Sequence, residues 1–192
     1  MKKYLLFLLF LLFFTFACVY LDNVNQPSHV GINEYFTILI QGTFNNSTTG
    51  RAWLAIKIPL GVRIDSIRYN TYNGATELLT QISDTVTKIA TNNFPPEPNM
   101  LWQGYETREY SGLGSGSYEA RVYLYVTNNA IPDTYLIDYR TGSSYHNHLL
   151  LDSILDQPLT IVATGIKEPA KKKIKLIRYD ILGRRLPFKY RK

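Results

Sequence analysis

The stretch Tyr118-Glu119-Ala120-Arg121-Val122-Tyr123-Leu124-Tyr125-Val126 decides the fold class. Successive side chains of a β-strand point to opposite faces, so a strand with one buried face alternates between two kinds of residue. One face of this stretch carries Tyr118, Ala120, Val122, Leu124 and Val126, and the other carries Glu119, Arg121, Tyr123 and Tyr125. This alternation predicts a half-buried strand over residues 118–126.

Short runs with a similar strand-forming composition recur on both sides of this stretch. They cover residues 35–40, 52–58, 62–69, 101–104, 134–139 and 159–162. Turn-forming clusters separate the runs, and Pro59 should end a strand because proline cannot donate to a ladder. The pattern predicts an all-β fold, an immunoglobulin-like antiparallel β-sandwich of about seven to nine short strands.

The segments between these runs are less decisive. Residues 77–89 place apolar side chains at helical spacing, but their Thr, Ser and Val content also suits two short strands around Ser83-Asp84, and we favour the strands. The prolines of 94–98 predict an extended loop. The Gly- and Ser-rich residues 111–117 predict a flexible turn, and a further loop is expected between 139 and 159.

Charge is distributed unevenly along the 192 residues, whose net charge is +6. Residues 167–192 hold eleven Lys and Arg against two acids, whereas residues 4–166 hold eight basic and thirteen acidic side chains. The body is therefore mildly acidic, which argues against a nucleic-acid partner. Cys18 is the single cysteine, so the chain has no intrachain disulfide and no cysteine-based zinc site.

The N-terminus predicts export. Lys2 and Lys3 precede an apolar run, and Thr15 and Ala17 supply small residues at a cleavage site, so we expect a signal peptide over 1–17. Two alternatives stay open: an uncleaved membrane anchor, if the apolar run continues to Leu21, or cleavage before a diacylated Cys18. The second resembles the lipobox of bacterial lipoproteins at Ala17 and Cys18, although Thr15 and Phe16 depart from it.

The stretch 131–139, Ile-Pro-Asp-Thr-Tyr-Leu-Ile-Asp-Tyr, resembles a late strand of immunoglobulin-like bacterial surface modules. In those modules a proline turn precedes a strand that contains tyrosine. The resemblance implies that Tyr135 donates a hydrogen bond to backbone across the turn.

The basic tail carries a second resemblance. After the linker at Gly165, residues 174–186 predict a β-hairpin whose turn includes a run similar to the C-terminal sorting domain of the type IX secretion system. The matching residues are Tyr179, Asp180, Ile181, Leu182, Gly183 and Arg184. The family's domain continues for several more strands, whereas this chain ends at Lys192. The resemblance implies passage across the outer membrane, and the alternative is a basic tail that touches anionic lipid.

No constellation predicts catalysis, a cofactor or a metal. His146 and His148 are interpreted as exposed loop residues, the nearby aspartates lack a calcium-loop spacing, and Gly114-Ser115-Gly116 lacks the strand-to-helix setting of a catalytic serine. Aromatic side chains are more often core, but an exposed set could stack on carbohydrate. The candidates for such a platform are Trp102, Tyr105 and Tyr110, with Trp53 beside them.

These observations predict three segments: a signal peptide over 1–17, a β-sandwich over 21–164 and a sorting-like tail over 165–192. The expected function is that of a secreted or cell-surface, non-catalytic module with a structural or adhesive role, associated with the outer membrane. Its expected partners are the export machinery, Sec and type IX, and membrane contact comes through the signal or a lipid anchor alone. The alternative is a surface or periplasmic lipoprotein, anchored at Cys18, that binds a ligand such as carbohydrate.

Overall fold

The computed structural model describes residues 18–46, 50–71, 76–108, 114–144 and 150–163. Ten strands and one helix lie in these ranges. They are β1 (Cys18–Asn25), β2 (His29–Gly31), β3 (Tyr35–Asn46), β4 (Ala52–Pro59), β5 (Val62–Thr71), β6 (Thr76–Ile82), α2 (Asp84–Asn93), β7 (Met100–Thr107), β8 (Gly114–Val126), β9 (Asp133–Ser143) and β10 (Leu150–Val162).

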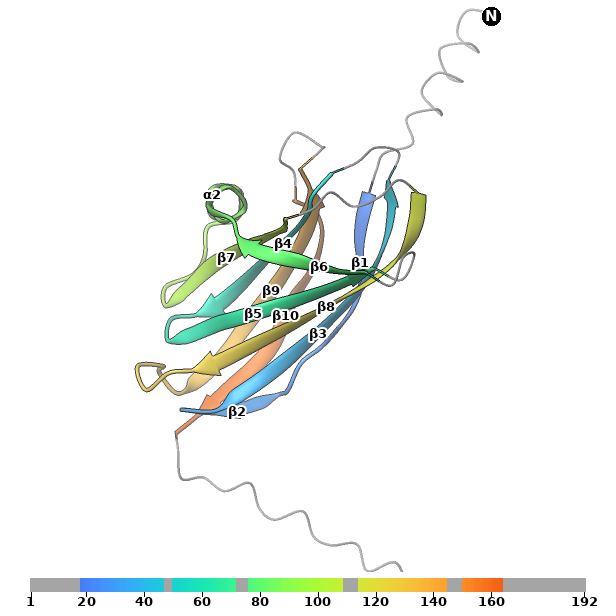
Figure 1. Ribbon diagram of the computed structural model, residues 1–192. Helices are drawn as coiled ribbons and strands as arrows, with labels where there is room; N and C mark the ends of the chain where they lie inside the picture. Colours follow the sequence, from blue (N-terminus) through green and yellow to red (C-terminus); the bar gives the residue numbers. More distant parts are fainter. Residues whose placement is uncertain (1–17, 47–49, 72–75, 109–113, 145–149, 164–192) are drawn as a thin grey trace, which may run out of the picture.

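The strands form one curled sheet in the order β1-β3-β8-β5-β6-β7-β4-β9-β10-β2. Every pairing is antiparallel except that of β2 with β10, which is parallel. Figure 1 shows the half around β3, β8 and β5 wrapping over the half around β4, β9 and β10, with α2 outside. Apolar side chains of both halves meet in one core, including Ile38, Val122, Ile56 and Ile137. The predicted all-β sandwich is confirmed.

Strand β8 confirms the half-buried strand that was predicted from the alternation over residues 118–126. Tyr118, Ala120, Val122, Leu124 and Val126 are all at most 1% exposed. The strand begins earlier than expected, because residues 114–117 pair with the end of β3 and do not form part of a turn. The glycines and serines there are compatible with an extended ladder, and they continue the pairing of β8 with β3 beyond the point where β5 ends.

Strand β6 carries the sheet from one half to the other. Its first part pairs with β5, up to Leu79 opposite Arg68, and its last part pairs with β7, from Thr80 opposite Thr107. At the crossing the Thr80 hydroxyl donates to the carbonyl of Ile67 at 2.8 Å. A side chain thus satisfies a carbonyl where β6 leaves β5.

Side-chain hydrogen bonds join β1, at one edge of the sheet, and the segment after it to β10, near the other edge. The backbone N–H of Leu21 on β1 donates to Asp152 Oδ2 on β10 at 2.7 Å, and Gln26 Nε2 donates to the carbonyl of Pro158 at 2.9 Å. Val19 and Leu21 on β1 are 3% and 8% exposed and belong to the core. Strand β1 therefore includes residues 18–20, which lie ahead of the predicted sandwich boundary at residue 21.

The segment 77–89 is half strand and half helix, so our preference for two strands is wrong for its second half. Ser83 has extended backbone and its hydroxyl accepts from the N–H of Val86, which makes it the N-cap of α2, with Asp84 in the first turn. The helix lies directly on β7, where Ser83 N–H donates to the carbonyl of Gly104 at 2.9 Å. A Cβ at Gly104 would lie 2.4 Å from the backbone nitrogen of Thr87, so the contact requires glycine.

Several smaller predictions can be checked. Pro59 ends β4, and residues 94–98 form no helix or strand, as expected. Tyr135 donates its hydroxyl to the carbonyl of Ile131 at 2.9 Å, which confirms the predicted corner. The loop expected between 139 and 159 is wrong at both ends, because β9 continues to Ser143 and β10 begins at Leu150.

Candidate functional site

The candidate site lies on the outer face of β4, which is buried on both sides. Inward-facing Leu54, Ile56 and Ile58 belong to the main core. Outward-facing Trp53 and Ala55 pack under α2 with Val86, Ala90, Trp102 and Leu150. The next position on this outer face is Lys57. Only 4% of the surface of this residue is exposed to solvent. A charged amine therefore lies where its neighbours along the strand are apolar.

Two carboxylates surround the amine. Lys57 Nζ is 2.7 Å from Asp138 Oδ2 and 2.9 Å from Glu97 Oε2. Lys57 lies directly opposite Asp138 in the β4–β9 ladder, and Glu97 comes from the proline-containing loop after α2. The side chains of Lys57, Asp138 and Glu97 are 5%, 12% and 62% exposed, so the cluster opens to solvent through Glu97.

The electrostatics of the cluster follow from these contacts. Burial disfavours the ammonium ion, but hydrogen bonds to Asp138 and Glu97 outweigh it and raise the pKa of Lys57 above its ordinary value. The hydrogen bond from Lys57 lowers the pKa of Glu97. The resting cluster therefore contains an ammonium ion beside carboxylates.

Asp138 is held from a second side. Its Oδ1 accepts from the backbone N–H of Asp156 at 2.9 Å. Asp156 has a φ of 56°, in the left-handed region, at a point where the β9–β10 register shifts. A non-glycine residue in this conformation carries some strain, and the bond to Asp138 helps to hold it. The Asp138 carboxylate is thereby fixed in front of Lys57.

Arg140 borders the cluster two positions along β9. Its Cζ lies 3.3 Å from the centre of the Phe94 ring and 6.0 Å from that of Trp102. Its buried Nε has no hydrogen-bond partner among the described residues. Burial lowers the pKa of Arg140, and Asp138 partly offsets this effect. Cation–π contact thus replaces part of the lost hydration.

The structure corrects the predicted aromatic platform. Trp102 and Tyr105 are 3% and 6% exposed, and Trp102 Nε1 donates to the carbonyl of Phe94 at 2.6 Å. Burial also raises the pKa of Tyr105 to about 12. A ring must present a face to solvent before it can stack on a sugar, and these two rings pack in the interior, as does Trp53. Tyr110 lies outside the described residues.

The other predicted site residues are placed as follows. Cys18 is the first residue of β1, and Ser115 lies within β8. Ala17, His146, His148 and the sorting motif 179–184 fall outside the described ranges. Within those ranges no group of three His, Cys, Asp or Glu side chains could hold a metal ion. The carboxylates of the cluster around Lys57 instead bind an amine.

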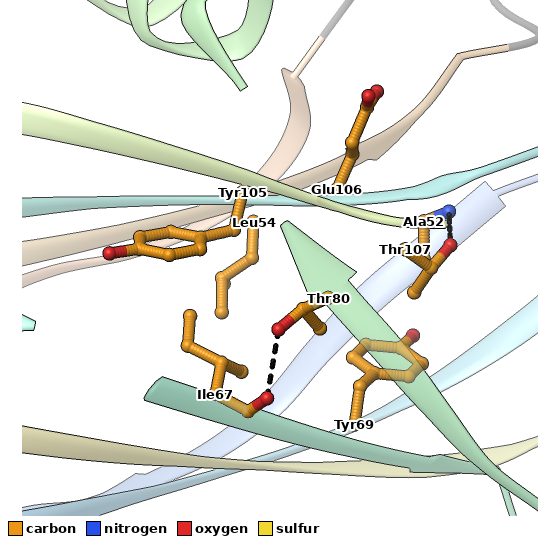
Figure 2. A pocket seen from close by; sticks show the side chains of 8 residues that line it. All are labelled: Ala52, Leu54, Ile67, Tyr69, Thr80, Tyr105, Glu106 and Thr107. Carbon is orange, nitrogen blue, oxygen red and sulfur yellow. Dashed lines mark hydrogen bonds between the residues drawn. The ribbon is translucent and has the colours of Figure 1, made fainter. Parts of the chain in front are cut away.

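A small pocket lies beneath the β6 crossing and shares no lining residue with the cluster around Lys57. Figure 2 shows its lining, in which Thr80 donates to Ile67 and the hydroxyl of Thr107 accepts from the N–H of Ala52 at 3.1 Å. The lining also includes Leu54, Tyr69, Tyr105 and Glu106. The space is no larger than a water molecule, and the two hydroxyls are already bonded to backbone groups of neighbouring strands. We interpret it as a structural feature of the crossing.

Sequence reasoning missed the cluster, although a signal for it was present. Lys57 is the one charged residue in the run Ala-Trp-Leu-Ala-Ile-Lys-Ile over 52–58. A charge inside a strand that is apolar on both faces requires a partner within the protein. The pattern could therefore have predicted a buried ion pair, but not which carboxylates supply it.

Comparisons with known proteins identify no family. No family model and no curated protein matches the chain. Among solved structures, the chain is similar to a cohesin module of a Clostridium perfringens family 33 glycoside hydrolase, at 12% identity and a TM-score of 0.42, covering 77% of this chain and 99% of that one. It is also similar to the major pilin SpaD of Corynebacterium diphtheriae, at 9% identity and a TM-score of 0.44, covering 76% of this chain and a third (33%) of the pilin.

A third similar structure is AvmM, described as catalysing macrocyclization in alchivemycin A biosynthesis, at 9% identity and a TM-score of 0.40, covering 76% of this chain and 88% of that one. These proteins differ in what they do, and none is similar enough to assign a function to this chain. In the part of the chain that the structure describes, no helix is long and apolar enough to cross a membrane.

Proposed function

We propose that the chain is an exported β-sandwich module that acts at the cell surface in a structural or adhesive role. The observation that carries the proposal is the position of the fold between two segments that we predict to be export signals. β1 begins at Cys18, directly after the signal-like segment, and β10 ends at Val162, before the sorting-like tail. Both predicted signals therefore flank the body in sequence without interrupting it.

The burial of β1 favours a removable signal over a membrane anchor. The apolar run reaches spanning length only if it is counted through Leu21. Val19 and Leu21 are core residues of β1, which pairs with β3. A helix that continued through these residues would remove β1 from the sheet. Cleavage after Ala17 leaves the folded body intact.

A lipid anchor at Cys18 is the second candidate, and the position of β1 is compatible with it. A diacylated Cys18 would be the first residue of β1, so the sandwich would stand directly on the membrane surface. Mass spectrometry of the mature N-terminus separates the two candidates. A diacylglyceryl group on Cys18 supports the lipoprotein, whereas an unmodified N-terminus excludes the lipid anchor.

The export proposal is tested by locating the protein in the producing bacterium. We expect the mature protein to be accessible to protease on intact cells. A variant in which Asp180 and Arg184 are both replaced by alanine should remain inside the outer membrane, because the sorting motif is lost. The matched control replaces Lys171 and Lys172, which lie in the basic tail outside the motif, and should still reach the surface.

The outcomes separate the parts of the proposal. Mature protein found only in the cytoplasm would overturn export altogether. Equal surface exposure of the two tail variants would overturn the sorting role of the motif and leave the N-terminal signal as the route out of the cytoplasm.

A further inference from the structure

We propose that Lys57 and Asp138 become joined by an intramolecular amide bond, which the folded chain forms itself with Glu97 as the proton-transfer group. The proposal rests on the geometry of the cluster and does not depend on where the protein is located. It would link β4 to β9 covalently through their side chains, in addition to the backbone ladder.

The fold places the two reacting groups in contact. Lys57 Nζ lies 2.7 Å from Asp138 Oδ2, and the two residues face each other across adjacent antiparallel strands. The ladder continues on the same strands with Ile56 opposite Tyr139 and Ala55 opposite Arg140, so the backbone holds the pair in register. Fixed contact of this kind can raise the effective concentration of one group at another by many orders of magnitude.

Burial supplies a driving force for the condensation. Lys57 and Asp138 hold opposite charges with side chains only 5% and 12% exposed. Keeping two charges away from water is costly even when they are paired. An amide is neutral, and its N–H and carbonyl need only ordinary hydrogen bonds. Glu97 is exposed, so the water that is released has a path to solvent.

The reaction balances without any co-reactant. A proton first moves from the Lys57 ammonium to the Asp138 carboxylate, which gives an amine and a carboxylic acid. Nζ then attacks Cγ of Asp138 and forms the C–N bond. Glu97, 2.9 Å from Nζ, accepts a second proton from the nitrogen and passes it to the departing hydroxyl of Asp138. The C–O bond breaks, one water leaves, and Glu97 regains its starting charge.

Other ion pairs in the described ranges lack the required nucleophile. The other pairs are Arg51–Glu106, Arg63–Asp65, Arg68–Glu77 and Arg121–Glu119, and each uses a guanidinium group. A guanidinium remains protonated in proteins, whereas the Lys57 ammonium ion can pass a proton to the carboxylate in contact with it and become a primary amine. The cluster around Lys57 combines a primary amine, burial and a second carboxylate.

The test is tandem mass spectrometry of the purified full chain after tryptic digestion. We expect a branched peptide that joins residues 52–63 to residues 122–140, lighter than the two linear peptides together by one water. Cleavage after Lys57 should be absent because the amine is acylated. Finding Lys57 cleaved and residues 122–140 linear in the folded wild-type protein would overturn the proposal.

Two variants assign the roles. Lys57→Arg keeps the positive charge but cannot form the amide, so it should yield only linear peptides. Glu97→Gln keeps the size of the side chain but removes the proton acceptor, and it should slow bond formation by about 100-fold or more. Branched peptide in Glu97→Gln at the wild-type rate would overturn the role of Glu97. If either variant fails to fold, the wild-type digest alone decides whether the bond exists.

Discussion

Strands β8 and β4 lie in opposite halves of the sheet and differ in how they are covered. β8 is buried on one face only, and its outer residues Arg121 and Tyr123 reach solvent. β4 is buried at every position, because α2 and the loop after it cover its outer face. A cation on the outer face of β8 is hydrated, whereas a cation on the outer face of β4 must find partners within the protein. This difference in covering creates the cluster around Lys57.

The largest expected effect concerns the inner faces of the two strands. A core substitution on either strand should lower the free energy of unfolding by a similar amount. Ile56 on β4 and Leu124 on β8 are both 0% exposed in the same core. Replacing either by alanine leaves a cavity and should lower the free energy of unfolding by about 2–5 kcal/mol. Urea denaturation of Ile56→Ala and Leu124→Ala measures this, with Leu136→Ala, half-exposed on β9, as a control that should lose far less. A small loss for either core variant would break the comparison.

The outer faces, by contrast, should differ. Lys57→Met leaves Asp138 buried without its cation and should cost about 1–3 kcal/mol, to which loss of the amide adds. Arg121→Met removes an exposed pair with Glu119 and should cost less than about 1 kcal/mol. Both variants keep a long side chain, so urea denaturation compares the loss of a covered charge, together with its amide, with the loss of an exposed one. Equal losses would show that α2 and its loop do not isolate Lys57 from water.

The same contrast explains how much could be predicted from the sequence. β8 was predicted with its correct faces, because one buried face gives strict alternation. β5 also alternates, but a bulge between Ile64 and Ser66 shifts its phase, so that Ile67 and Tyr69 also face inward. The shift does appear in the sequence, as two consecutive polar residues, Asp65 and Ser66, between Ile64 and Ile67.

Tertiary covering explains the errors at the candidate site. Trp102 and Tyr105 were candidates for an exposed platform, yet α2 and the opposite half of the sheet bury them. We expected a strand in place of that helix, because its Thr and Val residues favour a strand. The N-cap at Ser83 favours the helix instead. Glu97 and Asp138 are far from Lys57 in sequence, so only the fold could bring the three together.

The smallest expected effect is a pH dependence carried by Glu97. Asp138→Ala prevents the amide and keeps Lys57 charged, so the contact between Lys57 and Glu97 stays ionic. Because this contact lowers the pKa of Glu97 below 4.5 in the folded state, its stabilisation is present above pH 4.5 and is lost as the pH falls through the folded value. Glu97 is mostly exposed, so the stabilisation should be less than about 1 kcal/mol.

The measurement compares Asp138→Ala with Asp138→Ala/Glu97→Gln by urea denaturation across this pH range. The single variant should be slightly more stable near neutral pH, and the two curves should converge in acid, because a protonated Glu97 resembles the amide of glutamine. A difference that persists below the folded pKa would mean that Glu97 stabilises the loop by packing and not by its charge. Lys57 would then depend on Asp138 alone for its buried charge, and the contrast between β4 and β8 would rest on a single ion pair.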